Sequence, residues 1–212
     1  MGKQTGCYAD LIATSPVIAH PNRPTVANPA DITQYGVLEL EYGWDRLWPG
    51  KTIQQTSFGG LLKLEMLCDI ELCWETTSYL SQTDSSGTHQ GFGDNWLGLQ
   101  IRAYRQTKRV PTLAFSYAVK IPSAPTAAGL RTGRVDHALT LLASKDIAHF
   151  VFDFNVTEFL IGRPNAPGFD KSQQVNLAFS HAIRGDSSSR GSSMVRTDST
   201  TQRQDSFLRP GP

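Results

Sequence analysis

The chain lacks the features of a membrane-spanning helix, a disulfide framework or a nucleic-acid-binding surface. No window of its 212 residues approaches the ~18 consecutive apolar residues of a transmembrane helix. Its 20 Lys and Arg nearly cancel its 19 Asp and Glu, so no overall field points to nucleic acid or to an acidic partner. The cysteines Cys7, Cys68 and Cys73 are odd in number, and we interpret them as incidental rather than as a disulfide framework.

Motifs for catalysis or cofactor binding are also missing. No Gly-x-Ser-x-Gly elbow is present, and the five histidines are scattered, with no pair at metal-ligand spacing. Asp136, His137 and Ser144 are the residue types of a nucleophilic triad, but successive strand residues point to opposite faces, so Asp136 cannot orient His137 locally. The sequence therefore predicts a protein that is not an enzyme and that uses no cofactor and no metal.

The amino terminus has neither the basic start nor the apolar stretch of about 7–15 residues that an export signal needs. Residues 1–30 contain only broken apolar pieces, and residues 15–30 are rich in Pro and Asn. Two interpretations stay open: the chain is not exported, or its true start lies upstream of Met1. We assign residues 1–34 to an extended, Pro-rich lead-in.

The chain does contain segments of alternating apolar and polar residues, joined by connectors that alternate between long and short. Eight such segments lie between Val37 and Ile183. Several reach the ~9–11 residues of a strand that crosses a bilayer at a tilt, whereas strands of soluble proteins usually have about 5–6. Short connectors are expected at Cys68-Asp69, Arg105 to Pro111 and Lys145-Asp146. Bacterial outer-membrane barrels sort their loops by length in this way.

The alternation by itself is compatible with two arrangements. In a soluble sheet the polar face meets water, whereas in a membrane barrel it lines a polar lumen and the apolar face meets lipid. Segment length and loop alternation favour the membrane barrel. The lumen-lining residues that strand parity then assigns are Glu39, Glu41, Lys63, Glu65, Glu71, Glu75, Gln100, Arg102, Lys120 and Asp153.

Aromatic residues near the strand ends suit a girdle at the two membrane interfaces. Parity also places Leu80 on the apolar face and leaves Glu158 as the one acidic residue on that face. The residues that we assign to the girdle are Tyr42, Trp44, Trp48, Trp74, Tyr79, Trp96, Tyr104 and Phe159.

Three stretches carry a resemblance to a known family. They are Gly91 to Arg105, Pro111 to Pro122 and Gly133 to Asp146. In succession they resemble the bacterial outer-membrane family that is named for the MetA pathway of phenol degradation and is often called a transporter family. The similarity runs from about Asn22 to Arg184. It implies an outer-membrane β-barrel that passes small aromatic or hydrophobic compounds and has no catalytic residues.

After Ile183 the chain departs from this pattern. Residues 185–212 form a tract rich in Ser, Thr and Arg, without alternation. One interpretation is a disordered tail. The other is a truncation or frameshift at the point where the family continues with further strands.

The sequence thus predicts an all-β chain: an antiparallel, up-and-down transmembrane barrel of about eight strands, incomplete, over residues 35–184. The predicted function is a porin-like channel or transporter for small molecules in the outer membrane, with the lipid bilayer as partner and no nucleic acid. Two alternatives stay open: a soluble or periplasmic barrel that binds an apolar ligand, and a truncated fragment without function. The ligand-binding barrel would turn Leu97, Leu99, Phe115 and Tyr117 inward, and the membrane barrel would turn them to lipid.

Overall fold

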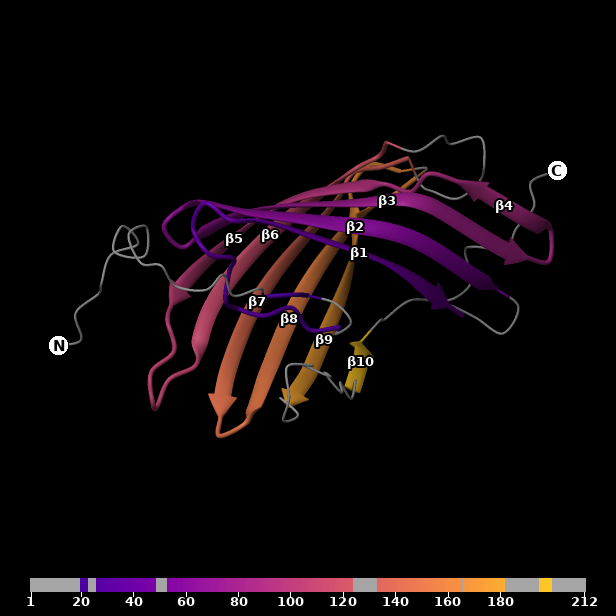
Figure 1. Cartoon of the computed structure of the whole chain (residues 1–212). Coiled ribbons are helices and arrows are strands. Elements are labelled where there is room, and N and C mark those ends of the chain that lie inside the picture. Colours follow the sequence, from indigo (N-terminus) through magenta and orange to yellow (C-terminus); the bar gives the residue numbers. More distant parts are fainter. Residues whose placement is uncertain are drawn as a thin grey trace.

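The computed structural model describes residues 20–22, 26–48, 53–123, 133–164, 166–181 and 195–199. Within them, antiparallel strands form one sheet that curves into an open half-barrel (Figure 1). The predicted all-β, antiparallel class is confirmed. No helix in these residues has the length and apolar character that crossing a membrane requires.

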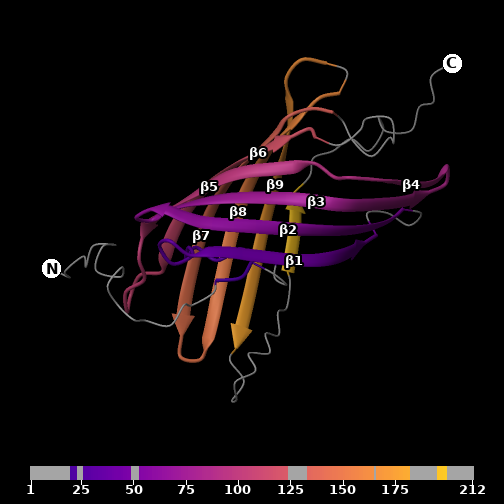
Figure 2. The same ribbon diagram turned by 45° about the horizontal axis from the view of Figure 1, so that its top comes forward.

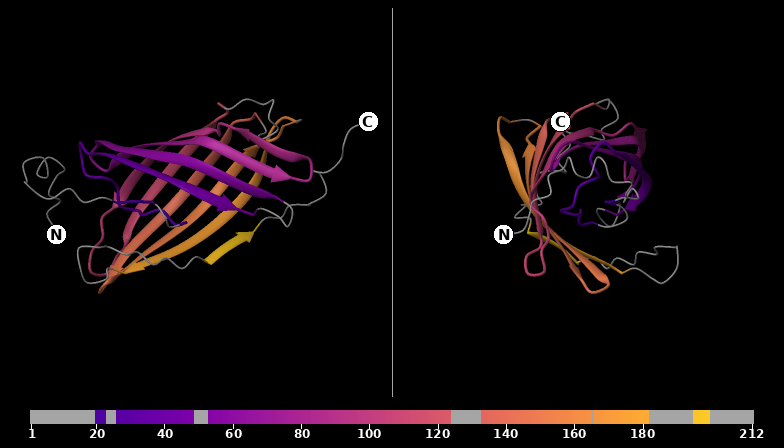
Figure 3. Two further views of the ribbon diagram at one scale, coloured as in Figure 1. Left: turned by 45° about the vertical axis from the view of Figure 1, so that its right-hand side comes forward. Right: turned by 60° about the vertical axis from the view of Figure 1, so that its left-hand side comes forward.

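The strands follow one another across the sheet in chain order, except that β4 folds back on the end of β3 and leaves β5 to pair with the rest of β3 (Figure 2). In the described residues, the β1 edge is not joined to the β9–β10 edge, and the curve stays open between them (Figure 3). The strands are β1 (Leu38–Leu47), β2 (Gln54–Leu67), β3 (Ile70–Asp84), β4 (Gly87–Gly91), β5 (Asn95–Tyr104), β6 (Thr112–Ile121), β7 (Asp136–Ile147), β8 (Phe150–Gly162), β9 (Phe169–His181) and β10 (Val195–Ser199).

Two connectors at one end of the half-barrel, β2–β3 and β7–β8, are two-residue turns, and the β5–β6 connector at the same end spans residues 105–111. Asp69 and Ala148 have positive φ values of 65° and 56° in the β2–β3 and β7–β8 turns, as tight hairpins require. The second turn lies at Ala148-His149, because β7 continues through Ile147, which pairs with Phe150. The prediction of a turn at Lys145-Asp146 was therefore wrong by three residues.

The connections at the opposite end that join neighbouring strands of the half-barrel, β1–β2, β3–β5, β6–β7 and β8–β9, are all longer than these two turns. The loop predicted between Gln82 and Asp94 contains a hairpin, because β3 runs to Asp84 and turns back as β4. This hairpin projects beyond the rest of the sheet (Figure 1). The β6–β7 connection spans residues 122–135, and its middle lies outside the described residues.

The two faces of the sheet differ sharply in chemistry. Large apolar side chains cover the convex face and are exposed, whereas polar side chains cover the concave face and are buried. The hydrophobic cluster among the buried described residues is small: Ala30, Ala114 and Leu142. The buried polar residues of the sheet are Lys63, Glu65, Glu71, Gln100, Thr112, Asp136, Ser144, Asp153, Asn155, Thr157 and Asn176.

A β-bulge in β3 places Leu80 on the face opposite to the predicted one. Phe58 pairs with Tyr79 and Gly59 pairs with Thr77, so Ser78 is an extra residue in β3. A bulge reverses the parity of the residues that follow it. Tyr79 therefore joins Phe58 on the convex face, with ring centroids 6.1 Å apart, and Leu80 lies on the opposite face from the one predicted.

Residues 195–199, within the tract predicted to be a disordered tail or a truncated or frameshifted end, pair with β9 as β10. The free edge of β9 offers unpaired N–H and C=O groups that such a segment can satisfy. The rest of residues 185–212 lies outside the described residues. Cys68 is disulfide-bonded, so interpreting it as incidental was wrong, whereas Cys73 is a free thiol.

Candidate functional site: the concave face

A stretch of the predicted lead-in, residues 26–33, runs along the concave face, and we call it the inner segment (Figure 3). Ala27 and Ala30 are fully buried there, and Ile32 is 2% exposed. Small side chains let the backbone approach the sheet closely, where it finds hydrogen-bonding partners. Residues 26–33 of the predicted extended lead-in are thus part of the packed interior.

Side chains of the sheet satisfy the backbone of the inner segment. The Asn155 amide accepts a hydrogen bond from the Asn28 N–H at 2.6 Å and donates one to the Asn28 carbonyl at 2.8 Å. Ala30 N–H donates to Ser144 Oγ at 2.7 Å. Because an irregular segment has no strand partner, these contacts replace the backbone pairing that burial otherwise demands.

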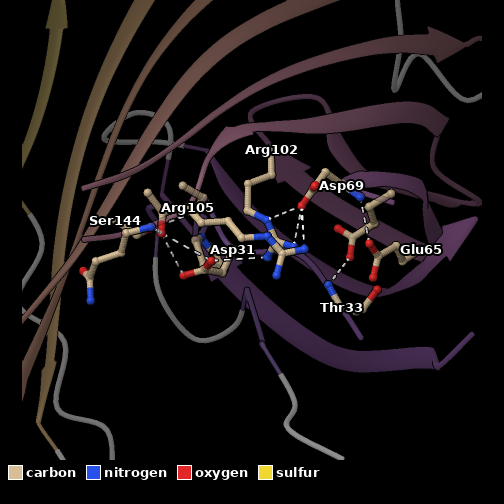
Figure 4. Close-up of polar contacts among 12 residues, drawn as sticks. Asp31, Thr33, Glu65, Asp69, Arg102, Arg105 and Ser144 are labelled. Carbon is tan, nitrogen blue, oxygen red and sulfur yellow. Dashed lines mark hydrogen bonds and ion pairs between the residues drawn. The ribbon is translucent and has the colours of Figure 1, made fainter. Parts of the chain in front are cut away.

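The segment is also held at its other end. Thr33 N–H donates to the Glu71 carboxylate at 2.7 Å (Figure 4). Gln100 Nε2 donates to the Pro29 carbonyl at 3.1 Å. Thr112 of β6 also donates to the Asp31 carboxylate, at 3.3 Å. Five strands, β3, β5, β6, β7 and β8, therefore contribute to holding residues 26–33 in place.

Lys63 is the most deeply buried charge on the concave face, with 1% of its side chain exposed. Its ammonium lies 3.1 Å from Glu39 Oε1 and 2.8 Å from Glu41 Oε1, and it donates to the His20 carbonyl at 2.5 Å. Glu39 is the register partner of Lys63, and Glu41 follows two residues later on the same face of β1. The alternating strand pattern itself brings the three charges together.

Arg102 lies between two carboxylates near the short-turn end (Figure 4). Its guanidinium is 2.6 Å from Asp69 Oδ1 and 3.4 Å from Asp31 Oδ1. Arg105 also contacts Asp69, at 2.9 Å. Asp69 comes from the β2–β3 turn and Asp31 from the inner segment, so three distant parts of the chain meet here.

Lys120 is the third cation of this face, near the long-loop end. It forms an ion pair with Asp136, its register partner on β7, and lies 3.8 Å from Asp94 Oδ2. The other carboxylate oxygen of Asp136 accepts a hydrogen bond from the Gly162 N–H at 2.8 Å. As with Lys63, two carboxylates flank one cation.

The residues predicted from parity to line a lumen all lie on strands β1, β2, β3, β5, β6 and β8, with side chains on the concave face. Glu75 is the exposed member of the set, and it lines a cavity. That the side chains of this set face an aqueous lumen stays a prediction. The buried or low-exposure members are Glu39, Glu41, Lys63, Glu65, Glu71, Gln100, Arg102, Lys120 and Asp153.

Sequence reasoning missed several residues of this face. Parity could have found Asp136 and Asn155, which lie on the polar side of their strands. It could not have found Asp31, Asp69 and Asp94, because these lie in connectors or in the inner segment, where no periodicity applies.

Trp96 also lies on this face rather than in an outward girdle. It has the parity of Gly98 and Gln100, pairs with Glu75 on one side and with Lys120 on the other, and lines the same cavity as Gln100. Aromatic content near a strand end was thus a weaker guide than alternation.

The cavity lies between the amino-terminal residues and the concave wall, and has a volume of about 740 Å³. Such a volume falls within the range of small-molecule sites. Asn22, Val26 and Asn28 line one side of it. The opposite wall comprises Cys73, Glu75, Trp96, Gly98, Gln100, Ser116 and Ala118.

The comparisons with known proteins give no relative for this chain: no family model, no curated protein and no solved structure matches it. Among the residues that the structure describes, no group of three or more His, Cys, Asp or Glu side chains is placed to hold a metal ion. The arrangement offers ion pairs, hydrogen-bonding groups and a cavity, all on the inner side of a curved sheet.

Proposed function

We propose that this chain forms part of an outer-membrane β-barrel that passes small molecules by diffusion along its polar interior, without catalysis. One observation carries the proposal: polar side chains are buried on the concave face while large apolar ones are exposed on the convex face. In water such an apolar surface would be unfavourable, because soluble monomers rarely expose contiguous apolar patches larger than a few hundred Å². In a bilayer the same surface is the expected one.

The alternative of a soluble barrel with an apolar ligand inside has less support. It requires Leu97, Leu99, Phe115 and Tyr117 to face inward, but these side chains lie on the convex face and are 38–42% exposed. The interior that such a ligand would enter is polar instead. The two-residue turns β2–β3 and β7–β8 at one end also favour the membrane barrel, whereas the β5–β6 connector at that end, residues 105–111, does not.

The proposal places a requirement on the sheet edges. A lipid-exposed strand edge leaves N–H and C=O groups without partners, which the hydrocarbon region does not tolerate. The edges of β1 and of β9–β10 must therefore be paired in the working assembly. The proposed similarity to the phenol-degradation family, with aromatic or hydrophobic permeants, fits this proposal.

Cell fractionation combined with heat-modifiable gel mobility tests the location. We expect the chain in the outer-membrane fraction, as a folded band whose mobility changes after boiling. Recovery of a folded chain from the soluble fraction would contradict the proposal, and so would the absence of any folded band. Swelling of liposomes that contain the purified chain then tests whether small solutes pass.

A further inference from the structure

The chain that precedes β1 crosses the concavity of the half-barrel (Figure 3). Residues 20–22 form hydrogen bonds with side chains of β1 and β2. Asn28 contacts Asn155 of β8, and Thr33 contacts Glu71 of β3. Because β5, β6 and β7 lie between β3 and β8 in the sheet, the chain reaches across the interior to β8 and comes back to β3.

The inner segment separates two parts of this interior. Val26 and Asn28 line the cavity of about 740 Å³, whose described lining otherwise comes from Asn22 and from strands β1, β2, β3, β5 and β6. No residue of β7, β8 or β9 belongs to that described lining. Asn155 of β8 and Ser144 of β7, which bind the segment, are 2% and 4% exposed. The segment therefore covers the polar wall of β7 and β8 and keeps it apart from the cavity.

The contacts that hold the segment are of a kind that water can replace. In the described residues, positions 28–33 form no backbone–backbone hydrogen bond with a strand, so the ladders of the sheet do not depend on the segment. Asn155, Ser144 and Gln100 contribute side chains instead, and water can satisfy such groups in a polar lumen. The Thr33 hydroxyl is buried and has no hydrogen-bond partner among the described residues, a cost that contact with water removes.

Displacement of the segment also leaves the interior charges paired. Asp31 of the segment lies 3.4 Å from Arg102, but Arg102 keeps Asp69 at 2.6 Å when Asp31 moves away. Two of the three buried apolar side chains of the segment are alanines, so little apolar surface meets water. Both features limit the free-energy cost of moving the segment while the sheet stays folded.

We propose that the inner segment is a plug: it closes the polar passage in this structure, and solutes pass once it moves off the wall of β7 and β8. The cavity and the uncovered wall then form one continuous polar interior. The rate of passage depends on the fraction of chains whose segment is displaced, so a weaker hold raises that rate. The plug rests on the proposed function, because it needs a passage to close.

Swelling of liposomes that contain the full-length chain, with arabinose as the permeant, tests the plug. Asn155→Ala removes the partner of both the Asn28 N–H and its carbonyl and should raise the swelling rate at least about threefold. Asp31→Asn hardly changes shape, weakens the contact with Arg102 and should raise the rate about twofold. Heat-modifiable mobility checks folding, and Asp31→Asn decides the test if Asn155→Ala does not fold. Unchanged rates in the folded variants would overturn the proposal.

Asn176→Ala is the matched control for a wider lumen. Asn176 is the register partner of Asn155 on β9, and its side chain accepts a hydrogen bond from Gln174 rather than from the segment. The substitution removes the same atoms from the same wall and should leave the swelling rate within about 1.5-fold, because it does not change the hold on the segment. An equal rise in Asn155→Ala and Asn176→Ala would mean that added space sets the rate, which overturns the plug.

A second readout follows the segment itself, in detergent. Ser144→Cys, in a chain whose free thiol is removed by Cys73→Ala, places a thiol against Ala30, where Ser144 is 4% exposed. A water-soluble maleimide should modify position 144 slowly, as peptide mapping reports. Adding Asp31→Asn should accelerate the modification at least about twofold. Equal rates with and without Asp31→Asn would contradict displacement of the segment.

The two proposals fail in distinguishable ways. A chain that never enters the outer membrane overturns the proposed function, and the plug with it, even if labelling in detergent shows that the segment moves. A chain that inserts and passes arabinose equally fast as the wild type, Asn155→Ala and Asp31→Asn overturns the plug and leaves the proposed function standing.

Discussion

The concave and convex faces of this sheet show opposite relations between polarity and burial. Lys63 on the concave face is 1% exposed, whereas Leu40, on the neighbouring strand and the other face, is 68% exposed. The polar interior is held by ion pairs and by hydrogen bonds to the inner segment. The apolar side chains of the convex face have no such contacts and are exposed. Where a soluble protein packs hydrocarbon, this chain packs charges and amides, so the stability of its interior depends on the pairing of polar groups.

The largest expected effect comes from breaking the most buried ion cluster. Lys63→Met leaves Glu39 and Glu41 close together without their cation, and we expect a loss of about 3–5 kcal/mol in the free energy of unfolding. Urea unfolding followed by tryptophan fluorescence measures it. The same change at the exposed Lys171 is the control and should cost less than about 0.5 kcal/mol. A loss below about 1 kcal/mol at Lys63 would mean that the interior is open to water.

The next largest effect is expected for a substitution on the convex face, and its size depends on whether that face meets water or lipid. Leu141 is 62% exposed, so Leu141→Arg should be almost neutral if the face meets water. Against lipid, an arginine near the midplane should cost about 2–4 kcal/mol, measured by unfolding in phospholipid vesicles. Ile147→Arg, at the end of the same strand, should cost less than about 1 kcal/mol because it lies near an interface. Equal small losses at both positions would count against the membrane proposal.

Breaking the contact between the inner segment and the sheet should cost less free energy of unfolding than either Lys63→Met or, in lipid, Leu141→Arg. Asn155→Ala removes the partner of both the Asn28 N–H and its carbonyl, which should cost about 1–3 kcal/mol. Hydrogen exchange at residues 26–33 should accelerate. Asn176→Ala is the control: Asn176 is also buried and accepts a hydrogen bond from Gln174, so its loss should leave that exchange unchanged. Faster exchange in both variants would indicate general loosening of the wall.

The smallest effect is expected for an ion pair outside the interior. Arg163 and Asp170 lie 2.7 Å apart, with 46% and 51% of their side chains exposed. Arg163→Gln should change the free energy of unfolding by no more than about 0.5 kcal/mol, because water and salt screen exposed pairs. The same urea experiment measures it, and a loss that approaches that of Lys63→Met would remove the distinction between interior and surface pairs.

Much of the sheet could be predicted because strand side chains alternate with a period of two. Alternation in β8 placed Asp153 and Asn155 on one face and Phe154 on the other, and the structure has the first two buried and the last 43% exposed. Local pattern failed at Ser78, where the bulge reverses the parity of Leu80. The alternation does not predict the bulge, because one inserted residue does not change whether the residues around it are apolar or polar.

The contacts of the inner segment with the sheet could not be predicted from local pattern. Asn28 and Asn155 are separated by 127 positions, and Ala30 and Ser144 by 114. The inner segment has no periodicity, so it was interpreted as a lead-in, and the aspartates of connectors were left out of the candidate site. Position along the chain says little about such contacts, because they form only once the sheet has curved.

The sequence by itself determined which side chains share a face between the bulges and the order in which the predicted strands pair, because both depend on residues close together in the chain. Only the tertiary structure decided which face lies inside. Curvature is a property of the whole sheet, and the placement of the inner segment against Asn155, Ser144 and Glu71 joins parts of the chain that no local rule connects.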